Sequence, residues 1–173
     1  MNILIAGDSE LTAYLSELLA KEKHNILVIS KNKDLIKRLE FNSDLMTHYG
    51  DSTSVSTLKE VLKRRFDLLL SLHLDGRLNI LTAIIAKKLG VKKCIAKSHE
   101  DEALSPEYKE LCKEFGVDFV VSPEKIASKE IVNLLKNSAA TEIFEFSGGQ
   151  MSLMLVRLEK NAPVIGKTLL EIR

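Results

Sequence analysis

The sequence predicts an α/β fold built on a doubly wound, parallel, six-stranded sheet. Short apolar runs alternate with amphipathic segments six times before residue 137, which is the order expected of strands joined by helical crossovers. The first run, 1–6, is continuously apolar, as expected for a strand covered on both faces. Gly7 breaks this run with a turn that leads directly into a helical pattern. These observations predict one sheet with helices on both of its faces.

The strands and helices are expected at short, regular spacing. The strands are predicted at 1–6, 25–29, 44–49, 67–71, 92–96 and 117–121, and the helices at 11–19, 35–39, 54–62, 78–89, 102–115 and 123–137. Ser54 is placed to cap the third helix, Gly90 and Gly116 end the fourth and fifth, and Pro123 opens the sixth at its tolerated first turn. The fifth helix is interrupted near Pro106. A five-stranded flavodoxin-like sheet is the alternative, and six strands with a glycine turn favour a Rossmann-like sheet.

The alternation of apolar runs and amphipathic segments ends after residue 137. Segments 142–146 and 150–158 read as two antiparallel strands joined by 147–149, and the segment from Pro163 starts another structural unit and stops inside it. We therefore predict two domains. Residues 1–137 form the Rossmann-type domain with its last, crossover helix, and 138–173 form a linker, a strand hairpin and the start of a truncated C-terminal domain.

The composition excludes several classes of protein. A chain of 173 residues with 45% hydrophobic and 28% charged residues is typical of a soluble globular protein, and its net charge of +1 gives no general attraction for nucleic acid. No apolar run approaches the about 20 residues that span a bilayer, and no signal segment opens the chain. Cys94 and Cys112 have no metal-ligand spacing and are expected to be buried rather than reactive. The sequence therefore predicts a cytoplasmic protein without a metal site.

The first turn carries a degraded dinucleotide-binding motif. Such a motif needs three glycines, one for the turn, one for close approach of the pyrophosphate and one for packing of the helix on the strand. Gly7 is present, whereas Ser9 and Thr12 stand at the second and third positions. Asp8 and Glu10 add negative charge at the same mouth, where it would repel a pyrophosphate.

A second departure lies at the end of the second strand. An acidic residue is expected there to hold the ribose hydroxyls, but Ser30 takes its place and Lys31 follows. Two interpretations stay open. In the favoured one the site has lost dinucleotide binding and persists as scaffold, with Asp8, Ser9 and Glu10 capping the first helix. In the other the site takes a mononucleotide or a 2′-phosphorylated ribose, and Ser30 and Lys31 receive the phosphate.

Taken together, the chain resembles the Trk/Ktr potassium-uptake regulatory subunits, the TrkA family, whose unit is the RCK (regulator of K⁺ conductance) N-terminal domain. The matching segments are 2–7, 49–52, 66–71 and 120–124, and 163–169 is similar to the opening of that family's C-terminal domain. The resemblance runs through the whole chain in order.

The resemblance implies a non-enzymatic, cytoplasmic regulatory subunit on the inner face of the plasma membrane, which gates a membrane potassium channel or transporter. It implies NAD(H), ATP, ADP or AMP as the ligand, and a homodimer through helix 122–137 or a higher ring. By position, the ligand contacts would be Gly7, Asp8, Ser9, Glu10 and Leu11 at the phosphates, Ser30 and Lys31 at the ribose, Gly50, Asp51 and Ser52 near the adenine, and Ser71, Leu72 and His73 at the cleft mouth.

Other residues also bear on the chemistry and assembly of the protein. His73 is the histidine best placed for a site, because α/β sites collect at the carboxyl ends of strands, but a solvent-facing loop histidine is the favoured interpretation. The predicted helix 123–137 carries more apolar residues than one core-facing stripe requires, which independently suggests a dimer. An NAD(P)-dependent oxidoreductase is the alternative function, although no Tyr-x-x-x-Lys pair is present, and a ligand-free structural subunit is the third.

Overall fold

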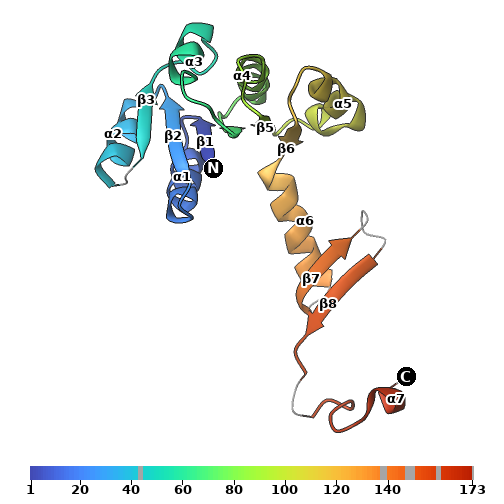
Figure 1. Cartoon of the computed structure of the whole chain (residues 1–173). Coiled ribbons are helices and arrows are strands. Elements are labelled where there is room, and N and C mark those ends of the chain that lie inside the picture. The colour runs from blue at the N-terminus through green and yellow to red at the C-terminus, as the bar shows by residue number, and fades with distance from the viewer. Residues whose placement is uncertain (43–44, 137–139, 147–150, 159–160, 173) are drawn as a thin grey trace. The chain divides into compact units, whose positions relative to one another are not determined.

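A computed structural model of the chain describes residues 1–42, 45–136, 140–146, 151–158 and 161–172 (Figure 1). The described chain forms two compact units, Met1–Pro123 and Glu124–Arg173. The first unit contains the parallel sheet and every residue predicted to bind a ligand.

The sheet has six strands, all parallel, in the order β3-β2-β1-β4-β5-β6. The strands are β1 (Asn2–Ala6), β2 (Asn25–Ser30), β3 (Met46–Tyr49), β4 (Leu68–Ser71), β5 (Lys93–Lys97) and β6 (Phe119–Val121). After β3 the chain returns to the middle of the sheet and places β4 beside β1. This order confirms the doubly wound Rossmann-like class, and it puts the topological switch point, where such sheets bind ligands, between β1 and β4.

The helices predicted from the sequence form with small shifts at their ends, and the structure adds one short helix near residue 170 that was not predicted. They are α1 (Glu10–Lys21), α2 (Lys33–Asn42), α3 (Val55–Val61), α4 (Gly76–Lys88), a short 3-10 helix (Glu102–Leu104), α5 (Pro106–Glu114), α6 (Pro123–Lys136) and α7 (Leu169–Ile172). The Ser54 side chain caps α3 by accepting from the Thr57 amide. Helix α4 starts earlier than expected because the Asp75 side chain accepts from the Arg77 amide and caps it there.

Both faces of the sheet are buried, as the unbroken apolar run of β1 predicts. Ile3 and Ile5 pack into a cluster with residues of α1 and α2 such as Ala13 and Leu39. The alternate β1 residues, Leu4 and Ala6, pack on the opposite face into a cluster with residues of α3, α4 and α5: Leu58, Val61, Ala83, Ala86 and Cys112. Cys94 and Cys112 are buried, as expected. Burial raises the pKa of the Cys94 thiol to about 12 and also raises the pKa of Cys112.

The second unit contains most of α6, an antiparallel pair of strands and α7. Strands β7 (Ala140–Phe146) and β8 (Met151–Val156) pair antiparallel, as predicted, while the connection expected at 147–149 lies outside the described residues. Helix α6 exposes large apolar side chains within the single chain: Ile126, Ile131, Val132, Leu134 and Leu135. Among the residues that the structure describes, no helix is long and apolar enough to cross a membrane.

Candidate functional site

The candidate site lies where β1, β2, β3 and β4 end and their loops begin. Gly7 opens it, and its amide donates to the Ile29 carbonyl at 3.1 Å. A Cβ on Gly7 would overlap the Thr12 hydroxyl and come within 3.1 Å of the backbone of Leu72. No other residue fits this turn without displacing a neighbour, so the structure gives Gly7 the role of the first motif glycine.

The other two motif positions are filled by hydroxyl side chains. Thr12 is fully buried, and its side chain occupies the space beside Gly7. Ser9 stands at the N-cap of α1, but its hydroxyl makes no hydrogen bond to the helix amides and lies 3.5 Å from Thr12 Oγ1. The expectation that the Ser9 side chain caps the helix is therefore wrong. The Ser9 carbonyl instead accepts from the Thr12 amide at 3.0 Å.

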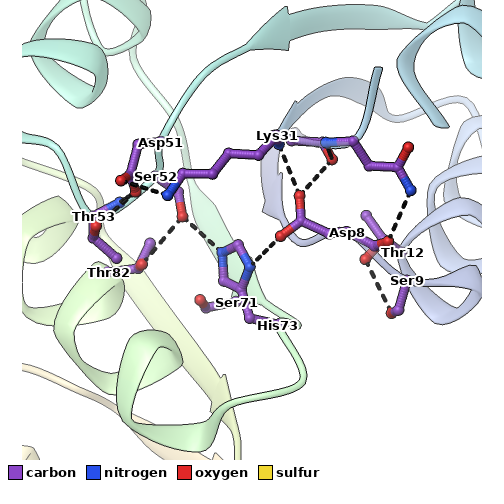
Figure 2. A network of polar contacts seen from close by, with 12 residues as sticks. Asp8, Ser9, Thr12, Lys31, Asp51, Ser52, Thr53, Ser71, His73 and Thr82 are labelled. Carbon is purple, nitrogen blue, oxygen red and sulfur yellow. Dashed lines mark hydrogen bonds and ion pairs between the residues drawn. The ribbon is translucent and has the colours of Figure 1, made fainter. Parts of the chain in front are cut away.

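Asp8 does not face the helix either, because its carboxylate is bonded to donors at the ends of β2 and β4 (Figure 2). Oδ1 accepts from Ser30 Oγ and from the Lys31 amide, both at 2.7 Å, and Oδ2 lies 2.9 Å from His73 Nδ1. Partial burial raises the pKa of Asp8, but the hydrogen bonds from Ser30, Lys31 and His73 together outweigh it and hold this pKa below its ordinary value. Asp8 is thus an ionised acceptor that joins β1 to the ends of β2 and β4.

Glu10 and Leu11, also expected at the phosphates, point elsewhere. Both Glu10 carboxylate oxygens accept from the Arg38 guanidinium of α2 at 2.9 Å, and the Glu10 side chain is 84% exposed. Leu11 packs against the apolar cluster under α1 and α2. Of the two acidic groups at this turn, only Asp8 reaches the strand ends.

Lys31 closes the side of the site toward β3. Its ammonium group pairs with Asp51 at 2.7 Å, while the Gly50 amide donates to the Ser30 carbonyl at 3.0 Å. The hydrogen bond from Lys31, helped by the Thr53 hydroxyl and amide, lowers the pKa of Asp51 to about 2. The amino group of Lys31, proposed from the sequence as a phosphate ligand, is therefore held by a carboxylate.

His73 is buried, with only 7% of its surface exposed. The favoured expectation of a solvent-facing loop histidine is wrong. His73 Nε2 lies 2.7 Å from Ser52 Oγ, which is itself 3.3 Å from Thr82 Oγ1 (Figure 2). Because Asp8 can only accept, Nδ1 donates to it, and in a neutral imidazole Nε2 then accepts from Ser52. The imidazole thus bridges the loops after β1, β3 and β4.

Asn79 on α4 fixes the position of His73, although it is not among the site residues predicted from the sequence. Its side-chain oxygen accepts from Ser71 Oγ at 2.9 Å and from the His73 amide at 2.7 Å. Its side-chain nitrogen donates to the His73 carbonyl at 2.9 Å and to the Lys97 carbonyl at 2.8 Å. The signal available in the sequence was a side-chain amide between the apolar residues Leu78 and Ile80. Leu72, between Ser71 and His73, packs into the core.

The arrangement is a network of satisfied polar groups rather than an open catalytic centre. Ser52, His73 and Asp8 have the hydroxyl–imidazole–carboxylate order of a nucleophile triad. Ser52, however, is only 1% exposed, so its hydroxyl is not presented to a substrate. The structure therefore brings together Asp8, Ser30, Lys31, Asp51, Ser52 and His73, with Ser71 joined through Asn79, and separates Glu10 from them.

The strand order and the glycine of the first turn define a Rossmann-type domain whose polar groups gather at the strand ends. The model of the TrkA-N domain family matches residues 3–123, and the chain belongs to this family. The resemblance inferred from the sequence is thereby confirmed.

The chain is also similar to a curated relative, and its fold is similar to that of solved structures. The chain is 26% identical over 176 residues to a Trk system potassium uptake protein TrkA homolog of Archaeoglobus fulgidus, a match that covers 99% of this chain and 39% of that protein. The TrkA-N domain of the inner membrane protein ybaL from Escherichia coli is similar with a TM-score of 0.66 and 17% identity, covering 78% of this chain and 96% of that one. A GsuK channel bound to NAD matches with a TM-score of 0.60 and 22% identity, covering 84% of this chain and 25% of that one.

Proposed function

We propose that this chain is a regulatory module of a Trk-type potassium uptake system, which senses a nucleotide or assembles with a membrane potassium transporter and gates it. The observation that carries the proposal is the match to a TrkA homolog along 99% of the chain, which includes the segment beyond the Rossmann-type domain. Since the chain spans 39% of that relative's length, the activity of the relative is assigned to this chain as a proposal only.

The module acts by binding rather than by catalysis. Its best nucleophile candidate, Ser52, is buried and bonded to His73 and Thr82. The module works in the cytoplasm, at the inner face of the plasma membrane. It forms a homodimer, or a higher ring, through α6, whose exposed Ile131 and Leu135 would be covered by a second copy.

The ligand of the module is an adenine nucleotide bound at the carboxyl ends of β1, β2 and β3. Similar folds support this choice, because GsuK structures are described as bound to NAD and to ADP. Gly7 preserves the turn that such ligands require, and the Lys31–Asp51 pair would have to rearrange for a ligand phosphate to reach the Lys31 amino group.

The regulatory role is tested in cells that lack their own Trk regulatory subunit. Expression of the protein is expected to restore growth and Rb⁺ uptake at low external K⁺, and a variant with Ile131→Asp and Leu135→Asp in α6 is expected to fail because its dimer face is charged. A protein that leaves uptake unchanged although it is produced and folded would contradict the proposal.

The sensing role is tested by thermal unfolding with NAD, NADH, ATP, ADP and AMP. A native-state ligand at about 100 times its Kd stabilises the protein by about 2.7 kcal/mol. If none of the five nucleotides raises the midpoint of thermal unfolding, the sensing role is refuted and the protein is an assembly subunit without a ligand. Turnover of a nicotinamide cofactor with a small substrate would instead favour the oxidoreductase.

A further inference from the structure

In a Rossmann-type cleft, the residues at the end of β2 contact the ribose of the ligand and distinguish a free 2′-hydroxyl from a 2′-phosphate. An acidic side chain there accepts hydrogen bonds from the ribose hydroxyls, whereas a basic neighbour accommodates a 2′-phosphate. Residue 30 of this chain is serine, which by itself gives neither preference. The sequence alone therefore left the kind of ribose open.

In the structure, a carboxylate from a different loop lies at this position. Asp8 belongs to the loop after β1, yet its Oδ1 lies 2.7 Å from both Ser30 Oγ and the Lys31 amide, at the end of β2 (Figure 2). The second carboxylate oxygen is held by His73, so the group is fixed from two sides.

The Asp8 carboxylate retains the capacity to bind a ligand. An ionised carboxylate offers about four acceptor positions, and the described contacts use three of them. The side chain is 38% exposed, in contrast to the buried Ser30 and His73 beside it. Hydroxyl groups can donate to such a group, whereas a second anion would meet its charge at short range.

The cationic side chain of Lys31 does not reverse this preference. The Lys31 ammonium group, which could neutralise a 2′-phosphate, is paired with Asp51 at 2.7 Å. The donors that would otherwise receive an anion, Ser30 Oγ and the Lys31 amide, already bind Asp8. The carboxylate thus occupies the place where a 2′-phosphate would have to bind.

We propose that Asp8 is the residue that selects the ribose in this cleft: it accepts hydrogen bonds from the free 2′- and 3′-hydroxyls of an adenine nucleotide and excludes a 2′-phosphorylated one. The inference rests on the proposed nucleotide-sensing role and deepens it. A Rossmann-type cleft is expected to have its ribose-binding carboxylate at position 30. In this chain position 30 is serine, and Asp8 supplies the carboxylate instead.

The test is isothermal titration of the full chain with two matched ligand pairs, NAD against NADP and ADP against 2′-deoxy-ADP. Because a hydrogen bond to a charged group is worth about tenfold in affinity, the wild type should bind NAD and ADP at least about tenfold tighter than their partners. In Asp8→Asn both preferences should shrink to about twofold, through weaker NAD binding and tighter NADP binding.

The control is Asp67→Asn, which makes the same chemical change at the opposite end of the sheet. Asp67 also accepts from a backbone amide, that of Asn2 at 2.9 Å, and pairs with Lys92 at 2.6 Å. Both preferences should be unchanged in this variant. Equal changes in the two variants would assign the effect to general loosening of the fold and would overturn the proposal.

The outcomes separate this inference from the role on which it rests. Wild-type protein that binds NAD and NADP equally, or prefers NADP, refutes the selection by Asp8 and leaves nucleotide sensing intact. Wild-type protein that binds none of the four ligands refutes both. If Asp8→Asn does not fold, equal wild-type affinities within either ligand pair would still overturn the proposal.

Discussion

Replacing Asn79 by alanine should be one of the most destabilising single changes in the first unit. Asn79 is fully buried, and its side chain makes four hydrogen bonds, to Ser71 Oγ, to the amide and carbonyl of His73, and to the Lys97 carbonyl. All four partners lose a bond in Asn79→Ala.

The magnitude follows from the cost of leaving these groups without partners. A buried polar group that loses its partner costs about 1–3 kcal/mol, more for the His73 amide, which has one hydrogen to donate, than for a carbonyl with a second lone pair. We expect Asn79→Ala to lower the free energy of unfolding by about 3–5 kcal/mol. The loop after β4 should loosen as well, because Asn79 is what ties it to β5.

The assay is urea denaturation followed by circular dichroism, with Asn25→Ala as the matched control. Asn25 is exposed, and its side chain donates to Asn2 Oδ1 at 2.9 Å. The control should cost less than about 0.5 kcal/mol. A loss below about 1 kcal/mol for Asn79→Ala, or equal losses in the two variants, would refute the argument that this amide organises the site.

Three further changes test other features of the site and the core. The pKa of Asp51 is lowered, so its contribution to stability is present above its unfolded value of 3.8 and is lost as the pH falls toward about 2. Its side chain is 38% exposed, so Asp51→Asn should lower the free energy of unfolding at pH 7 by less than about 1 kcal/mol. The free energy of unfolding of the variant should also decrease less steeply than that of the wild type as the pH falls below 3.8. Gly7→Ala should cost about 1–3 kcal/mol by overlap with Thr12, and adding Thr12→Ala should cost less than the sum of the single changes. Cys94, with a pKa of about 12, should not react with a thiol reagent at pH 8 until the protein is unfolded in urea.

Each of these has a clear contrary result. An equally steep decrease for Asp51→Asn and the wild type at low pH would mean that the Lys31 pair is absent in solution. Strict additivity of the changes at Gly7 and Thr12 would show that the two residues do not compete for the same space. Rapid labelling of Cys94 in the native protein would show that the face of the sheet under α4 opens readily.

The sequence predicts the elements and their class well because these depend on local patterns. The apolar runs, the Ser54 cap and the glycines after α4 and α5 act over a few residues, and the structure places helices and strands accordingly. Where the ends differ, as at α4, the reason is a cap, Asp75, that the apolar pattern does not reveal. The sequence also predicts that the residues after the strands lie near one another, because loops after parallel strands converge at one edge of the sheet.

The contacts of those residues could not be predicted in the same way. Asp8 is 22 residues from Ser30 and 65 from His73 along the chain, and no local rule relates them. Capping of α1 was the natural local expectation for Asp8 and Ser9, but the network across the strand ends offers Asp8 three donors at once. The burial of His73 likewise depends on Asn79, a residue of the following helix.

The sequence by itself determined the doubly wound sheet, the turn at Gly7 and the resemblance to the TrkA family, because periodicity, turn chemistry and ordered motifs are properties of the linear chain. Only the tertiary structure decided which groups meet at the mouth of the sheet. The strand order places β2 and β4 on either side of β1, so the loop after β1 lies between two sets of donors. That placement turns Asp8 from a repulsive charge in a degraded motif into an oriented acceptor at the end of β2.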